Sequence, residues 1–212
     1  MRTLTLIVDE AWNGSTVKHL LRARLHMAEG LIARVKLRET GLVRNGERVF
    51  TNARLRTGDV LCVEIGDEGA VNEALPIAAP LTFVYEDEDM IVLNKAAGVS
   101  VHPGPGHFSD TLGNFLLYYY DSKGDPSDLH PVHRLDRGTS GLMVVARHPH
   151  AQEILKGQLH TADFRRTYLA VCEGVPQPAE GVIDVPMGPK PGSLMEQQVR
   201  PDGKPARTRY RV

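Results

Sequence analysis

Apolar residues recur at helical spacing in two stretches near the start of the chain. Residues 16–26 place their apolar side chains on one stripe and their basic side chains off it, which predicts an amphipathic helix. Residues 28–38 repeat this pattern and predict a second helix. In that helix Arg34 and Arg38 are four residues apart and are expected to share one exposed face.

Short β-strands are expected after these two helices. Apolar residues flank Asn45-Gly46, a dipeptide that favours a two-residue hairpin turn, and an apolar strand is expected over 60–65. Residues 66–80 have no apolar period and are rich in glycine, proline and acidic residues, which indicates a linker.

Beyond residue 80, strands and helices alternate. A helix is expected over 111–120, with Ser109 or Asp110 as its N-terminal cap. A second helix is expected over 149–160, because proline suits its first turn. Alternating apolar residues over 166–173 predict a strand.

Composition is that of an ordinary globular protein. The chain has 212 residues, 42% hydrophobic and 24% charged, enough for one large or two modest domains. It has no apolar run long enough for a membrane helix and no signal-peptide pattern. Cys62 and Cys172 each lie in an apolar run, so we expect core thiols in a reducing cytoplasm, with a disulfide between them as the alternative.

The net charge of −1 conceals a segregation of charge. Residues 12–56 hold ten lysines and arginines against three acidic residues, and residues 57–129 hold two against thirteen. Residues 130–212 are basic again, with twelve against eight. Two basic regions on either side of an acidic one favour a nucleic-acid partner, although solvated helix faces are the plain alternative.

One carboxylate stands out chemically. Asp136 lies between Arg134 and Arg137 in a turn-prone segment, directly before an apolar strand over 142–146. A carboxylate held by two guanidinium groups stays ionised and could act as a nucleophile or charge stabiliser. Taken alone, the pattern favours an ordinary Arg-Asp-Arg ion-pair turn.

The residues around Asp136 resemble a known motif. His133-Arg134-Leu135-Asp136, then Thr139-Ser140-Gly141-Leu142 and an apolar strand, resemble the catalytic motif of the RluA family of RNA pseudouridine synthases. Arg147 stands where that family usually has lysine. Further blocks in the family's order are residues 86–104, 166–171 and 204–210.

This resemblance implies an α+β protein. Residues 81–212 would form a catalytic domain with a mixed, mainly antiparallel β-sheet and flanking helices. Residues 12–66 resemble an S4-type RNA-binding domain, as in RluD-like members, with residues 67–80 as the linker. The S4-like segment departs from its pattern at Ala28-Glu29-Gly30, where a Ser-Arg pair is common.

The implied reaction is the isomerisation of specific uridines to pseudouridine in RNA, expected to be ribosomal RNA, without a cofactor. Asp136 would be the catalytic carboxylate, and Tyr168 would stack on the uracil or help remove its C5 proton. Arg134 would fill the space of the flipped base. Arg137, Arg34 and Arg38 are expected to contact RNA, and His133 to orient the Asp136 loop by a backbone hydrogen bond.

Two competing motifs are weak. His102, His107, His130 and His133 do not form a closed set of ligands at metal-binding spacing, so no metal is expected. The His-Arg-Leu-Asp run has the wrong order for a kinase catalytic loop, and no Asp-Phe-Gly follows it.

The chain is shorter than the family's pattern. A later motif, Thr-Gly-Arg-x-His-Gln-Ile-Arg, is missing, so we expect a fragment that lacks the C-terminal part of the catalytic domain. These residues alone would retain RNA binding with weak or absent turnover. The alternative is a non-catalytic RNA-binding protein or an inactive synthase fragment. In either case we expect a cytoplasmic monomer that binds RNA and no membrane.

Overall fold

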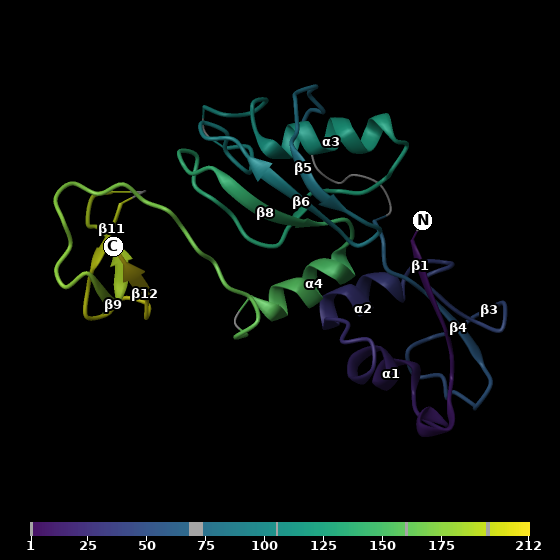
Figure 1. Ribbon diagram of the computed structural model, residues 1–212. Coiled ribbons are helices and arrows are strands. Elements are labelled where there is room, and N and C mark those ends of the chain that lie inside the picture. The colour runs from purple at the N-terminus through teal and green to yellow at the C-terminus, as the bar shows by residue number, and fades with distance from the viewer. Residues whose placement is uncertain (1, 68–73, 105, 160, 194–195) are drawn as a thin grey trace. The chain divides into compact units, whose positions relative to one another are not determined.

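The computed structural model describes residues 2–67, 74–104, 106–159, 161–193 and 196–212. The chain divides into two compact units, Met1–Arg165 and Arg166–Val212. Each unit contains antiparallel sheets of its own (Figure 1). Within the described ranges, no helix is long and apolar enough to cross a membrane.

The N-terminal part of the first unit is a four-stranded antiparallel sheet beside two short helices. The strand order is β1-β4-β2-β3, with bounds β1 Thr3–Ile7, β2 Leu42–Arg44, β3 Glu47–Arg48 and β4 Val60–Glu64. A 3-10 turn covers Glu10–Trp12, and the helices are α1 Val17–Ala23 and α2 Glu29–Val35. Their apolar faces form one core with the sheet, including Leu20, Leu31 and Leu61.

The Asn45-Gly46 hairpin is confirmed. Both residues have positive φ, 53° and 85°, as a twisted two-residue turn requires. The Asn45 side chain also accepts a hydrogen bond of 2.8 Å from the amide of Val60 and donates one of 2.8 Å to Asp59. The sheet includes β1, which lies before the expected domain start at residue 12. Of the expected linker 67–80, residues 68–73 lie outside the described residues.

The second helix is shorter than expected, because α2 ends at Val35 and not at residue 38. The chain turns sharply here, and a Cβ atom at Gly41 would lie only 1.9 Å from the carbonyl oxygen of Val35. Arg34 and Arg38 therefore do not share a helical face, as the longer helix had predicted.

The rest of the first unit is built on a second antiparallel sheet with the order β5-β6-β8-β7. Its strands are β5 Phe83–Glu86, β6 Met90–Lys95, β7 His130–Pro131 and β8 Gly141–Ala146, and its helices are α3 Leu112–Ser122 and α4 Pro149–Gln158. Figure 1 shows α3 along one side of this sheet and α4 on the other.

Side chains alternate along β8, so the sheet packs against α3 on one face and against α4 on the other. Met143 and Val145 belong to the core that includes Leu116 of α3, whereas Ala146 belongs to a separate cluster with Ala151 of α4. The expected arrangement of an antiparallel sheet with flanking helices is therefore present in this part of the chain.

The N-terminal cap of α3 differs from the prediction of Ser109 or Asp110. Thr111 is the cap: its hydroxyl accepts a hydrogen bond of 3.4 Å from the Asn114 amide, and the Asn114 side chain accepts one of 3.1 Å from the Thr111 amide. The helix begins one residue later than expected, so this reciprocal pair becomes possible.

The second unit consists of two small antiparallel pairs, β9 with β12 and β10 with β11. Their bounds are β9 Glu180–Asp184, β10 Met187–Pro189, β11 Gln197–Val199 and β12 Arg207–Arg211. The expected strand over 166–173 is absent: these residues pair with no strand in the described ranges, and a strand needs a paired neighbour. Cys172, expected in a core, is accordingly exposed.

Candidate active site at the Asp136 loop

Asp136 lies in the loop that joins β7 to β8. Leu135 before it is buried in the core beneath the sheet, 7% exposed, and anchors the loop. The carbonyl oxygen of Asp136 accepts a hydrogen bond of 3.1 Å from the Thr139 amide, which closes a β-turn. The Asp136 side chain is exposed. An anchored residue and a closed turn thus present one carboxylate at the surface.

The two flanking arginines do not clamp this carboxylate. Within the described ranges, neither Arg134 nor Arg137 forms an ion pair with Asp136. The Nε atom of Arg137 instead donates a hydrogen bond of 3.0 Å to the carbonyl of Gly98, and the Gly98 amide donates one of 2.7 Å to the carbonyl of Arg137. The expected Arg-Asp-Arg clamp was wrong in its geometry, because the Arg137 side chain ties two loops together.

The cation that interacts with Asp136 is Lys95, a residue that was not predicted from the sequence. Lys95 ends β6, is 2% exposed and pairs across the sheet with Gly141, the first residue of β8. Its ammonium group donates to the carbonyls of Val99 at 2.8 Å, Ala96 at 3.0 Å and Arg137 at 3.4 Å. Lys95 therefore connects the loop after β6 to the loop that carries Asp136.

Electrostatics links Lys95 to Asp136 directly. Burial lowers the pKa of Lys95, because a charged ammonium is costly away from water, and the negative charge of Asp136 opposes that effect.

His133 fixes the other end of the loop. The Val132 amide donates a hydrogen bond of 3.0 Å to the carbonyl of Val144, and the Val144 amide donates one of 3.2 Å to Nε2 of His133. The imidazole thus takes the place of a backbone acceptor where β7 ends. This is the backbone hydrogen bond expected of His133, and it holds the loop against β8. The ring also meets Phe164 edge-on, with centroids 5.9 Å apart.

Arg134 and Arg137 act electrostatically on two side chains in the segment between β6 and α3. Desolvation lowers the pKa of His102, and the positive charges of Arg134 and Lys156 lower it further. The hydrogen bond from His107 lowers the pKa of Asp110, and the charge of Arg137 adds to this. The charges of Arg134 and Arg137, which flank Asp136, thus act on two side chains between β6 and α3.

Tyr168 belongs to the second unit. It lies outside any strand, and its side chain is 59% exposed. The structure thus does not build Tyr168 into a sheet, and its pairing with Asp136 in one active site stays a prediction.

Arg34 and Arg38 have different environments. Arg34 is exposed on α2. The Arg38 side chain is only 10% exposed, lies 3.4 Å from the carboxylate of Glu64 and donates a hydrogen bond of 2.9 Å to the carbonyl of Gly66. Arg38 therefore makes structural contacts inside the protein. The expectation that Arg38 faces RNA does not fit this geometry.

Arg147, at the position where the RluA family usually has lysine, is also structural. Its guanidinium lies 3.2 Å from the carboxylate of Glu86, donates 2.8 Å to the carbonyl of Asp87 and pairs closely with Asp125. Burial alone would lower the pKa of Arg147, but the hydrogen bond and charge of Asp125 raise it overall. The planar fork of arginine serves these three acceptors at once.

Two of the four histidines that lie close together in the sequence pair with separate carboxylates. His107 pairs with Asp110 at 2.7 Å, and His130 pairs with Asp67 at 2.8 Å. Among the residues with described positions, no group of three or more histidine, cysteine or acidic side chains is arranged to hold a metal ion.

Comparison with known proteins identifies the family. Residues 89–212 match the family model described as RNA pseudouridylate synthase. The chain is 36% identical over 188 residues to the uncharacterized RNA pseudouridine synthase YjbO of Bacillus subtilis (strain 168), covering 89% of this chain and 66% of the relative. It is 30% identical over 211 residues to YhcT, an uncharacterized RNA pseudouridine synthase of the same strain, covering 100% of this chain and 69% of the relative.

A further relative has a more specific name. The chain is 39% identical over 173 residues to ribosomal large subunit pseudouridine synthase D of Escherichia coli O157:H7, covering 78% of this chain and 53% of the relative. The chain thus spans between about half and two thirds of these relatives. The matched segment includes β6, the Asp136 loop and β8. This chain belongs to the RNA pseudouridylate synthase family.

Proposed function

We propose that this protein converts uridine to pseudouridine in RNA, and that ribosomal RNA is its substrate. The observation that carries the proposal is the placement of Asp136, an exposed carboxylate on a fixed turn, inside the segment that matches the family. The choice of ribosomal RNA rests on the name of the Escherichia coli relative.

The reaction is an isomerisation. The bond between ribose C1′ and uracil N1 breaks, the base turns, and C1′ bonds to C5, which loses its proton while N1 takes one up. The ionised carboxylate of Asp136 attacks the base or the sugar, or stabilises a cationic C1′ by its charge. The target base must leave its stack, and Arg134, which is exposed beside Asp136, would fill the vacated space.

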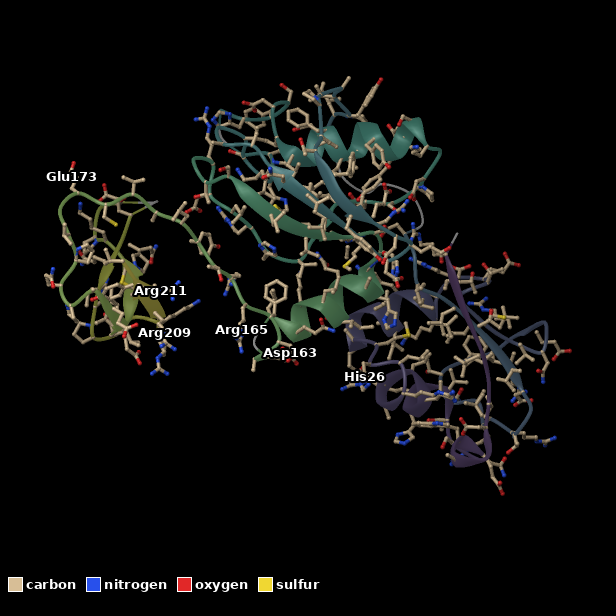
Figure 2. The ribbon with its side chains drawn as sticks, in the orientation of Figure 1. His26, Asp163, Arg165, Glu173, Arg209 and Arg211 are labelled. Atoms are coloured by element: carbon tan, nitrogen blue, oxygen red, sulfur yellow. The ribbon has the colours of Figure 1, made fainter. Side chains whose placement is uncertain are left out.

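RNA binding would extend beyond this site. We assign it to an S4-type domain over 12–66, where the exposed Arg34 is a candidate contact, and to Arg137 at the active-site loop. In the second unit, Arg207, Arg209 and Arg211 alternate along β12 and so share one face of that strand, from which Arg209 and Arg211 are exposed (Figure 2). The protein would act as a cytoplasmic monomer without a cofactor or metal.

One observation favours a second candidate, an RNA-binding protein without catalysis. Tyr168 is exposed outside any strand, and a tyrosine that acts on uracil is expected in a fitted pocket. The intact Asp136 loop, with Lys95 beneath it, argues more strongly for the enzyme.

Release of tritium from ribosomal RNA labelled at uracil C5 separates the two candidates, because the C5 hydrogen leaves when C1′ bonds to C5. The enzyme releases tritium in proportion to the pseudouridine formed. Binding of the same RNA without release, in the protein at its full natural length, would support the non-catalytic alternative.

A further inference from the structure

Phe50 is an exposed aromatic side chain at the turn that follows β3. Its side chain is 59% exposed, whereas Val49 before it is buried. The carbonyl of Phe50 accepts a hydrogen bond of 3.0 Å from the Ala53 amide, which closes a tight turn. The carbonyl of Thr51 accepts a hydrogen bond of 2.9 Å from the backbone amide of Lys18, in the first turn of α1. The backbone of this turn is therefore hydrogen-bonded to a helix.

One side of the Phe50 ring is occupied by Arg48. The guanidinium carbon lies 5.4 Å from the ring centroid, within the range of a cation–π contact. The same guanidinium donates hydrogen bonds of 3.2 Å to the carbonyl of Leu37 and 3.5 Å to that of Lys36, directly after α2. Carbonyls at the end of a helix attract a cation. Among the described residues, no second ring or cation lies over Phe50.

The surroundings of this pair are basic. Lys36 is exposed beside the Arg48 contact, and residues 12–56 carry ten lysines and arginines against three acidic residues. Leu37 is also 75% exposed, so the apolar surface here exceeds a single ring. A partner with flat aromatic faces and a negative backbone complements this combination, and RNA has both features.

We propose that the Arg48–Phe50 pair is a stacking site for one unpaired base of the RNA substrate. This inference rests on the proposed RNA substrate and adds a preference for a single-stranded segment of that RNA. A base inside a duplex has both faces covered by its neighbours, whereas an unpaired base offers a face to the ring. The exposed Lys36 would contact the adjoining phosphate.

A stacking assay tests the site. The probe is a short single-stranded oligoribonucleotide with one 2-aminopurine, whose fluorescence falls on stacking, compared with the same strand annealed to its complement. The variants are Phe50→Leu, which keeps apolar bulk without a π face, and Phe50→Trp, which enlarges the π face. Tyr118→Leu removes an exposed aromatic ring from α3, in the acidic part of the chain, and is the matched control.

We expect Phe50→Leu to weaken binding of the single strand at least about fivefold and to abolish the loss of fluorescence. Phe50→Trp should bind as well as the wild type or better, and Tyr118→Leu should be unchanged. Duplex affinity should stay the same in all three variants. Equal single-strand affinities for the wild type and Phe50→Leu would overturn the stacking site alone. Failure of the wild type to bind any RNA would overturn the proposed RNA substrate itself.

Discussion

The ammonium group of Lys95 donates a hydrogen bond of 3.4 Å to the carbonyl of Arg137, the residue that follows Asp136. The bond crosses from the end of β6 to the loop before β8, and Lys95 is almost fully buried. Lys95 thus acts through the Asp136 loop, both by holding its backbone and by placing a positive charge beneath it.

We predict that Lys95→Met lowers the rate of pseudouridine formation about 10- to 100-fold, because a displaced carboxylate loses its alignment with the substrate. The control is Asn94→Ala, whose side chain is exposed on the opposite face of β6. An unchanged rate in Lys95→Met would contradict this role of Lys95.

The hydrogen bond from the Val144 amide to His133 gives a second prediction. His133→Ala should lower the free energy of unfolding by about 1–3 kcal/mol, because the amide loses its acceptor. It should also reduce turnover, since the loop is no longer held against β8. His133→Gln retains an acceptor and should recover part of both losses. Chemical denaturation and tritium release measure the two effects; a fully active His133→Ala would contradict the loop-orienting role.

Arg34 and Arg38 should differ sharply on substitution, although the sequence suggests similar roles. Arg34→Ala should weaken RNA binding and reduce the slope of log affinity against log salt by about one, as loss of one phosphate contact does. Arg38→Met should lower the free energy of unfolding by about 3–5 kcal/mol, because it leaves the buried carboxylate of Glu64 without its cation. An unchanged salt slope in Arg34→Ala would exclude Arg34 from the RNA contact.

The Arg147–Asp125 pair predicts a pH dependence of stability. Burial would raise the pKa of Asp125, but hydrogen bonds from Ser127 and Arg147 lower it below its ordinary value of 3.8. The unfolded chain therefore binds the proton more tightly, so the stabilisation is present above about pH 3.8 and is lost as the pH falls through the folded-state pKa.

Asp125→Asn should be less stable than the wild type at pH 7, and its free energy of unfolding should fall less steeply below pH 4. Asp121→Asn, which changes an exposed carboxylate at the end of α3, is the control for the general effect of removing a negative charge. Identical acid slopes for Asp125→Asn and the wild type would contradict this account.

Patterns that depend on neighbouring residues predicted the structure well. The Asn45-Gly46 turn and the helices α1 and α3 follow from local conformational preference and apolar spacing. The strand expected over 166–173 is absent, because a strand exists only with a hydrogen-bonded neighbour, which alternation along one segment cannot supply.

In the candidate site, too, local features could be predicted and contacts between distant segments could not. The turn at Asp136 and the backbone hydrogen bond of His133 could be expected from the sequence. The partners of the arginines could not, because contacts between distant segments decide them. Lys95 was missed although the sequence contains its signal. Ile91, Leu93 and Lys95 alternate along β6, which places the lysine on the buried face with two core residues. A lysine on a core face is a candidate for a functional role.

The identity of Asp136 as the catalytic carboxylate is the central claim, and tritium release from RNA labelled at uracil C5 tests it most directly. The comparison is the wild-type protein at its full natural length against Asp136→Asn, with Asp121→Asn as the matched exposed control. We predict that Asp136→Asn binds the RNA with unchanged affinity and releases no tritium, while Asp121→Asn matches the wild type. Equal release from Asp136→Asn and the wild type would contradict the account.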